Sequence, residues 1–137
     1  MPPAAVGDTA SIETTLSAAD VERFAGITGD ENPVHLDDDY AAETVFEGRV
    51  AHGILTAGVV SAALAKLPGD VVYLAQDLAF DAPVYPGDTV RAEVRVTEVL
   101  DGDRLEVETV ATVPDRDERV ISGTATVLSL PMATPAE

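Results

Sequence analysis

The stretch Gly53-Ile-Leu-Thr-Ala-Gly-Val-Val-Ser-Ala-Ala-Leu-Ala-Lys-Leu67 is apolar on nearly every face when it is arranged as a helix. Small residues recur along it, and Pro68-Gly69 ends it. A helix without a polar face must be covered by protein on most of its sides, and this one is too short to span about 30 Å of hydrocarbon. We therefore expect a buried helix at the centre of the fold, with the rest of the chain around it.

The sequence after this helix has the pattern of β-strands separated by turns. We predict strands over residues 71–80, 89–100, 104–113 and 119–130, because each gap between them contains Pro, Gly or Asp. In the strand 89–100, apolar residues occupy every second position from Val90 to Val96, which is typical of an antiparallel sheet with one buried face. Val99 breaks this period, so a bulge is expected near Thr97-Glu98.

The sequence before the helix predicts one strand and two shorter helices. Residues 9–16 are rich in Thr and Ile and are expected to form a strand. Ser17 has the character of a helix N-cap, Asp20 completes a capping box, and the helix that follows ends at Gly29. A brief acidic helical turn is expected over 36–42, followed by a loop over 44–50.

These elements together predict a single α+β domain over residues 1–137, with loose arms at 1–8 and 131–137. In this domain a long central apolar helix is wrapped by a curled antiparallel sheet. That layout is called a hot dog fold.

Composition and charge exclude several kinds of partner. The sequence has 25 acidic and 8 basic residues and a formal net charge of −17, so nucleic acid is not expected to bind. The absence of cysteine rules out a disulfide framework, a thiolate metal site and a thiolate nucleophile. Residues 1–5 have neither the basic nor the apolar part of a leader peptide. We expect a cytoplasmic protein that does not enter a membrane.

The acid excess leads to a prediction about salt. Acidic side chains that coat a folded surface repel one another unless salt screens them, and the Debye length falls to about 3 Å at 1 M. Our hypothesis is a cytoplasm of high ionic strength, as in a halophile. We expect thermal unfolding, followed by circular dichroism, to begin at a higher temperature in molar KCl than in dilute buffer. Equal stability and activity in the two solutions would contradict the hypothesis.

The segment Thr28-Gly-Asp-Glu-Asn-Pro-Val-His35 places a carboxylate, an amide and an imidazole on one short loop. Asn32-Pro33 forces an extended or turn geometry there. Because imidazole titrates near neutral pH, an acid and a base held together in this way indicate proton-transfer chemistry. Downstream, Ala51-His52-Gly53 opens the central helix, whose first N–H groups could bind a developing negative charge.

These motifs resemble those of a known family. The stretch Phe24-Ala-Gly-Ile-Thr-Gly-Asp-Glu-Asn-Pro-Val-His-Leu-Asp37 is similar to the signature of the MaoC-like (R)-specific enoyl-CoA hydratases. Ala51-His-Gly-Ile-Leu55 resembles the start of their central helix, and residues 83–88 resemble the turn before their long strands. The likeness extends over roughly residues 11–130. The motif is more acidic than the family pattern at Glu31 and at residues 37–39.

The resemblance implies a homodimeric hot dog enzyme that hydrates trans-2-enoyl-CoA to (R)-3-hydroxyacyl-CoA, without a metal or redox cofactor. It implies these site residues: Asp30 and His35 as the catalytic pair, Asn32 and Ser61 as positioning residues, and Gly53 as the source of an oxyanion N–H. The acyl group would lie along the central helix, where Val60 and Leu64 are candidate lining residues. Core packing explains these two residues equally well.

Other interpretations of the same residues stay open. His52 directly precedes a helix, where a satisfied cap is commoner than a chemical role. No metal is expected, because the chain has only 2 histidines and no complete ligand spacing. The alternative functions are a dehydratase of another hydroxyacyl-CoA or a mesaconyl-type substrate, a hot dog thioesterase, and a non-catalytic acyl-CoA-binding module. Substrate range, release of free CoA, and binding without turnover respectively distinguish these three from the hydratase.

Overall fold

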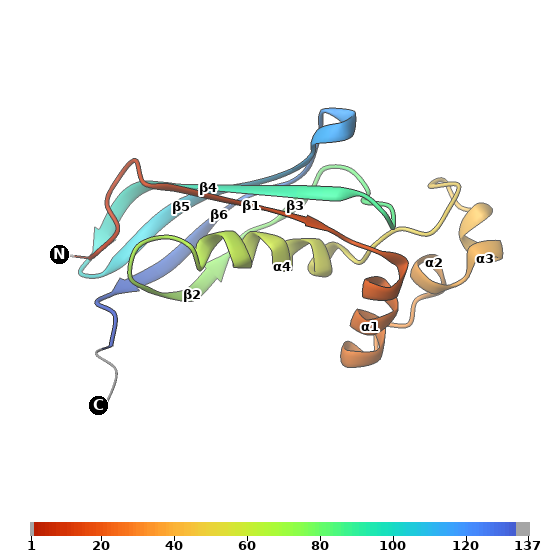
Figure 1. Ribbon diagram of the computed structural model, residues 1–137, viewed down its shortest axis with the longest axis horizontal. Helices are drawn as coiled ribbons and strands as arrows, with labels where there is room; N and C mark the ends of the chain where they lie inside the picture. Colours follow the sequence, from red (N-terminus) through yellow and green to blue (C-terminus); the bar gives the residue numbers. More distant parts are fainter. Residues whose placement is uncertain (1, 134–137) are drawn as a thin grey trace.

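The computed structural model describes residues 2–133 and consists of one curled sheet with four helices (Figure 1). The helices are α1 (Ala18–Thr28), α2 (Pro33–Leu36), α3 (Asp38–Ala42) and α4 (Gly53–Leu64), and a 3-10 turn, η1, covers Pro114–Arg116. The strands are β1 (Thr9–Thr15), β2 (Asp70–Gln76), β3 (Ala79–Phe80), β4 (Thr89–Asp101), β5 (Arg104–Val113) and β6 (Glu118–Leu130). All pairings are antiparallel, in the order β1-β4-β5-β6-β2, and β3 also pairs with β6.

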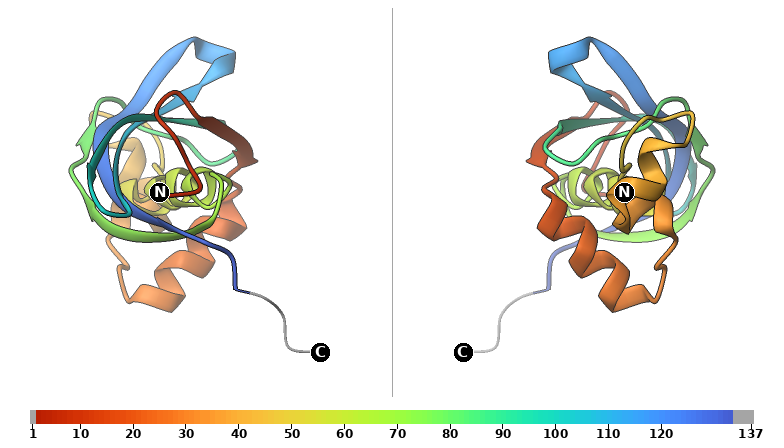
Figure 2. Two further views of the ribbon diagram at one scale, coloured as in Figure 1. Left: turned by 90° about the vertical axis from the view of Figure 1, so that its left-hand side faces the viewer. Right: turned by 90° about the vertical axis from the view of Figure 1, so that its right-hand side faces the viewer.

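The helix α4 lies inside the curl of this sheet, as the views along its axis show (Figure 2). One continuous core joins its buried side chains to those of the strands, among them Val60 and Leu64 of α4, Val90 and Val96 of β4, and Val107 of β5. The bulge expected in β4 is present as a shift of register between Val96 and Glu98. The structure therefore confirms the hot dog fold predicted from the apolar helix and the alternating strands.

The first helix begins at the predicted capping box. The Ser17 hydroxyl accepts a hydrogen bond from the Asp20 N–H at 3.1 Å, and the Asp20 carboxylate accepts one from the Ser17 N–H at 2.9 Å. The hydrogen bond from the Ser17 backbone lowers the pKa of Asp20. The stability that this carboxylate contributes is therefore present above its unfolded-state pKa and is lost as the pH falls through its folded-state pKa.

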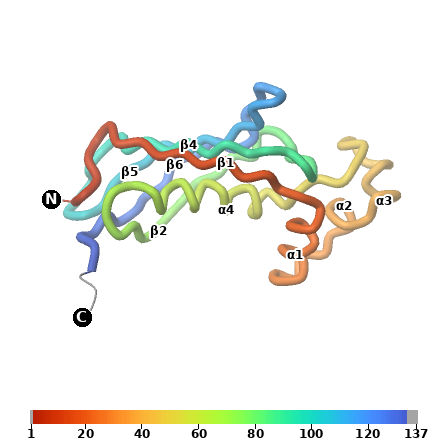
Figure 3. Tube along the Cα trace, in the orientation of Figure 1, coloured from red at the N-terminus to blue at the C-terminus, as the bar shows by residue number. Residues whose placement is uncertain are grey.

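The helices α1, α2 and α3 lie together at the N-terminal end of α4, while the segment before β1 and the end of β6 lie at its opposite end (Figures 1 and 3). Gly29 closes α1 in the left-handed conformation, with φ +82°, and its N–H donates to the Ala25 carbonyl. The chain then turns into α2. This arrangement brings the segment with Asp30 and His35 to the start of the central helix.

The strand predicted over 71–80 is interrupted and forms two elements, β2 and β3. The reason lies in β6: a Cβ at Gly123 would lie 2.0 Å from the Asp77 carbonyl oxygen. Asp77 closes over this glycine through two hydrogen bonds with Thr124, one from its own N–H at 3.1 Å and one to its carboxylate at 2.9 Å. Because Gly123 of β6 has no side chain, the neighbouring strand can break at Asp77.

Two predictions about the helices also change. The helix α4 ends at Leu64 and is followed by a turn over residues 65–66. Among residues 2–133, none of the helices has the length and hydrophobicity of a membrane span. Pro33 begins a short helix, because proline is favoured in a first helical turn, where only an extended segment or turn was predicted. Residues 131–133 are exposed, and the rest of the predicted C-terminal arm lies outside the described residues.

Part of the N-terminal segment is held against the sheet, although a loose arm was predicted for residues 1–8 and residues 5–7 are exposed. Ala4 is 1% exposed, and its N–H donates to the buried Ser129 hydroxyl at 3.1 Å. Gly7 N–H donates to the Val96 carbonyl at 2.9 Å, and Asp8 accepts from Val96 N–H at the same distance. These contacts close the end of the core that lies away from α1.

Candidate active site

The segment with the acidic and imidazole side chains is shaped by two caps. After Gly29 the chain leaves α1, and Asn32 becomes the N-cap of α2, where its side-chain oxygen accepts from Val34 N–H at 3.4 Å. Pro33 occupies the first turn and His35 the last. Asn32 therefore holds the loop geometry through its side-chain oxygen, and it also lines the neighbouring cavity.

The His35 ring is oriented by a main-chain carbonyl. Its Nδ1 lies 2.7 Å from the Val50 carbonyl oxygen, and because a carbonyl can only accept, Nδ1 carries the proton. In the neutral imidazole the other ring nitrogen, Nε2, is therefore the one that carries no proton. The ring is half-buried and lines the cavity. This arrangement gives His35 a basic nitrogen that is available to a substrate or a water molecule.

Asp30 is exposed and is held through its main chain. Its carbonyl oxygen accepts a hydrogen bond from Nε2 of His52 at 2.9 Å, while its carboxylate accepts one from the Asn32 N–H at 3.4 Å. One side-chain nitrogen or oxygen from each of Asp30, His35 and His52 lies within 4.8 Å of the others. A single water molecule can bridge two polar atoms over such a distance.

The N-terminus of α4 faces the same place. Gly53 is the first helical residue and lines the cavity, and the first N–H groups of a helix have no acceptor within it. A Cβ at this position would meet the Phe80 ring at 2.6 Å. Only glycine therefore fits here without displacing that ring.

A cavity of about 580 Å³ opens beside these groups. Besides Asn32, His35 and Gly53, its walls come from the loop before α4, from α4 itself, from residues 80–84 and from β6, and they are mainly apolar: Val34, Phe46, Val50, Ala51, Ile54, Thr56, Phe80, Asp81, Ala82, Pro83, Val84, Val120 and Ile121. This volume is in the range of ordinary small-molecule sites. Its apolar lining, with polar groups at one edge, suits an acyl chain that carries a reactive polar end.

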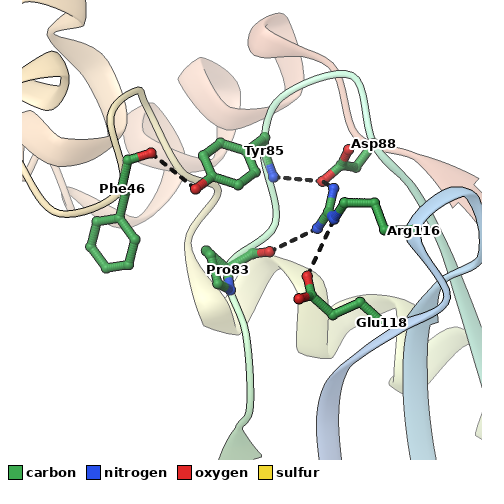
Figure 4. Close-up of polar contacts among 6 residues, drawn as sticks. All are labelled: Phe46, Pro83, Tyr85, Asp88, Arg116 and Glu118. Atoms are coloured by element: carbon green, nitrogen blue, oxygen red, sulfur yellow. Dashed lines mark hydrogen bonds and ion pairs between the residues drawn. The ribbon is translucent and has the colours of Figure 1, made fainter.

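Arg116 braces one wall of this cavity (Figure 4). Its guanidinium contacts the Asp88 carboxylate at 2.7 Å and donates to the Pro83 carbonyl at 3.1 Å, and the bond to Asp88 raises the pKa of Arg116. Tyr85 lies beneath this guanidinium, 5.7 Å from it, and its hydroxyl donates to the Phe46 carbonyl at 2.9 Å. The two cavity residues Phe46 and Pro83 are thus tied to the tip of the β5–β6 hairpin.

Three predicted site residues lie elsewhere. Val60 and Leu64 are 0% and 2% exposed and belong to the core rather than to the cavity wall, because the cavity ends near the first turn of α4. Ser61 lies about 12 Å along the helix from Gly53, at the usual rise of about 1.5 Å per residue, and does not line this cavity. Its positioning role stays a prediction.

The cluster of Asp30, His35 and His52 also offers ligand atoms to a metal ion. The two imidazole rings, however, are stacked, with centroids 3.8 Å apart and planes inclined by 29°. A ring nitrogen binds a metal at about 2.0–2.1 Å along its lone pair, in the plane of the ring. Lone pairs of two stacked rings converge poorly on one ion, so the geometry favours hydrogen bonding over coordination.

Sequence reasoning missed two parts of this site. His52, assigned above to a structural cap, makes no side-chain capping bond and instead contacts both Asp30 and His35. Its position directly before Gly53 was the available signal. The wall formed by residues 80–84 was not anticipated either, since its place depends on the pairing of β3 with β6 and on the hydrogen bond from the Ala51 N–H to the Val84 carbonyl.

Comparison with known proteins adds an independent finding. The profile of the MaoC like domain family matches residues 4–117. The chain is 45% identical over 125 residues to the (R)-specific enoyl-CoA hydratase of Rhodospirillum rubrum, covering 89% of this chain and 85% of that protein. It is 44% identical over 124 residues to the 3-hydroxybutyryl-CoA dehydratase of Methylorubrum extorquens, covering 89% and 78% respectively. The solved structure of the (R)-hydratase from A. caviae involved in PHA biosynthesis superposes with a TM-score of 0.85 at 36% identity, covering 93% of this chain and 97% of that one.

Proposed function

Because this chain belongs to the MaoC-like domain family, we propose that it is an (R)-specific enoyl-CoA hydratase, a hydro-lyase that adds water reversibly to trans-2-enoyl-CoA. The observation that carries the proposal is that Asp30 lies close to His35, and that His35 and Gly53 of α4 both line one apolar cavity. The product is (R)-3-hydroxyacyl-CoA. The dehydratase among its relatives is named for the reverse direction of such a reaction, dehydration of a 3-hydroxyacyl-CoA.

Asp30 and His35 carry out the proton transfers. Nε2 of His35, the unprotonated ring nitrogen, removes a proton from water as the water oxygen attacks C3 of the enoyl group. The Asp30 carboxylate, which holds the same water and has an oxygen within 4.8 Å of a His35 ring nitrogen, takes this proton from the imidazolium and delivers it to C2, so that both residues return to their starting states. Both new bonds then come from one water molecule on one face of the double bond, which gives syn addition and accounts for a single product configuration.

The thioester oxygen needs hydrogen-bond donors while the enolate forms. The Gly53 N–H lies at the start of α4, where the helix dipole adds positive potential. A preorganised donor of this kind stabilises developing negative charge and contributes strongly to catalysis. The Gly53 N–H is therefore proposed to donate to the thioester carbonyl oxygen, and the apolar walls of the cavity are proposed to bind the acyl chain.

Substitution of this glycine tests the assignment. Gly53→Ala is expected to lower kcat/KM for crotonyl-CoA by about 10- to 100-fold, because its methyl group would displace Phe80 and shift the N–H from the thioester oxygen. Gly58→Ala in the same helix is the matched control, since a Cβ there meets nothing within 4 Å, and it should keep wild-type turnover. Equal kinetics in the two variants would remove Gly53 from the mechanism.

The partner that best suits the sheet edge is a second copy of the chain. β2 and β3 both pair with the same side of β6 and form an outer edge of the sheet. This edge exposes large apolar side chains, with Val72 at 41%, Leu74 at 42% and Phe80 at 53%. Unpaired apolar edges are usually covered in soluble proteins. A homodimer is therefore proposed, and light scattering coupled to size-exclusion chromatography should report twice the mass of the chain.

The direct test follows the loss of enoyl-thioester ultraviolet absorbance with crotonyl-CoA in molar KCl, and then determines the product configuration. Loss of absorbance with an (R)-3-hydroxy product would support the hydratase. Release of free CoA, detected with a thiol reagent, would indicate a thioesterase instead. Binding of crotonyl-CoA and longer enoyl-CoA without turnover, in a protein shown to be folded, would contradict the proposal and favour a binding module.

A further inference from the structure

His52 lies buried at the point where the two proposed catalytic residues meet. Its side chain is 2% exposed and occupies the N-cap position of α4 without making a capping bond. It contacts Asp30 through a hydrogen bond and His35 through the face of its ring. We propose that His52 is a positioning residue that holds Asp30 and His35 together at the cavity, an inference that rests on the hydratase function proposed above.

The contact to Asp30 ties an exposed loop to a buried helix start. Nε2 of His52 lies 2.9 Å from the main-chain carbonyl oxygen of Asp30. Since the carbonyl can only accept, Nε2 carries the proton and donates it. The residues from Gly29 to Asn32 are all exposed, so this bond anchors the carboxylate-bearing residue to a rigid part of the fold.

The contact to His35 restrains the catalytic ring. The His52 ring stacks on that of His35, with centroids 3.8 Å apart, and meets Phe24 on α1 at 4.7 Å and 55°. The hydrogen bond from Nδ1 to the Val50 carbonyl limits rotation of the His35 ring within its own plane. A flat neighbour over its face prevents the ring from swinging, so the two contacts together set the direction of the basic Nε2.

A purely structural role would not select histidine at this position. Nδ1 of His52 is buried and has no hydrogen-bond partner among the described residues, and a buried polar atom without a partner destabilises a fold. An apolar side chain of similar size would avoid that cost. What histidine offers here is an N–H donor and a flat ring at once, which are the two features that the contacts to Asp30 and His35 use.

Three substitutions separate these features. His52→Ala removes both contacts, His52→Gln keeps an N–H donor near the position of Nε2, and His52→Phe keeps the flat ring. Ser129→Ala is the matched control, because that buried hydroxyl contacts the Ala4 N–H and the Pro68 carbonyl at the far end of the core. For each variant, kcat and KM with crotonyl-CoA and the unfolding temperature should be measured under the same conditions.

We expect His52→Ala to lower kcat by about 10-fold or more with KM changed by less than about threefold, as displacement of catalytic groups produces. The Gln and Phe variants should each recover part of the loss. Ser129→Ala should unfold at a lower temperature with wild-type kcat. Wild-type kcat in His52→Ala, or folded Gln and Phe variants no better than His52→Ala, would overturn the proposal. If His52→Ala does not fold, wild-type kcat in both other variants would overturn it.

A second readout does not depend on turnover. In nitrogen-detected NMR of the imidazole groups, the Nδ1–H of His35 should be protected from exchange in the wild type and in Ser129→Ala, and should exchange faster when His52 is replaced by Ala or Gln. Unchanged protection in both variants would contradict the ring contact. Absence of crotonyl-CoA turnover in the wild type would count against the proposed function instead, so the two failures can be told apart.

Discussion

Replacement of His35 by asparagine is expected to lower kcat for hydration of crotonyl-CoA by about 10²-fold or more, the usual contribution of a general base. The asparagine amide can still donate to the Val50 carbonyl, which Nδ1 of His35 approaches to 2.7 Å. It has no basic nitrogen at the position of Nε2. The fold should therefore persist while the water molecule loses the group that removes its proton.

Comparison with His35→Ala separates the two roles of this ring. Alanine loses the bond to Val50 as well as the base, so it should unfold at a lower temperature than His35→Asn but show a similar loss of kcat. The kcat of each variant should be measured from the decrease in ultraviolet absorbance over a range of pH. Turnover in His35→Asn within about tenfold of wild type would exclude His35 as the base.

The second large effect is expected for Asp30→Asn, which should also lower kcat by about 10²-fold or more. Asparagine has the same shape, and its side-chain oxygen can still accept from the Asn32 N–H. The main-chain carbonyl that accepts from His52 is untouched. The amide cannot take up a proton and return it to C2, so the loss should appear in kcat while the loop geometry is kept.

Glu31→Gln is the matched control for this variant. Glu31 is the adjacent residue, it is exposed, and its substitution changes the net charge by the same amount. If the effect at Asp30 came from the general electrostatic field, the two variants would behave alike. We expect Glu31→Gln to keep wild-type kinetics, and a comparable loss in both variants would contradict a specific role for the Asp30 carboxylate.

Much of the fold was predictable because the signals that specify it are local. The capping box of Ser17 and Asp20 involves residues three positions apart, and the structure contains it as expected. The alternation from Val90 to Val96 follows from the geometry of a single strand, and the same geometry revealed the bulge before Glu98. Because α4 is apolar on nearly every face, we expected a sheet around it, and this is the arrangement observed.

Features that depend on contacts distant in sequence were not predictable in this way. The break between β2 and β3 arises where Asp77 closes over Gly123 on another strand. The burial of Ala4 depends on Ser129, at the opposite end of the chain. In both cases the local sequence is compatible with the wrong expectation, and a single distant residue decides the outcome.

The candidate site also has parts that could be predicted from the sequence and parts that could not. Asp30, Asn32 and His35 stand within one short segment, so their proximity could be inferred from the sequence. The cavity could not, because its walls combine the loop with Phe46, the residues around Phe80 and the strand β6. Val60 and Leu64 lie in the core, which apolarity along α4 could not show, and a lining role for them stays a prediction.

By itself, then, the sequence determined the central helix, the alternating strands and the pairing of an acid with a base, since each of these follows from periodicity or from short-range backbone geometry. The tertiary structure alone decided which nitrogen of His35 bonds to a carbonyl, that His52 contacts both Asp30 and His35, and where the cavity lies. Those properties depend on the direction of individual side chains across distant elements. Packing of the whole chain sets these directions, and no local pattern records them.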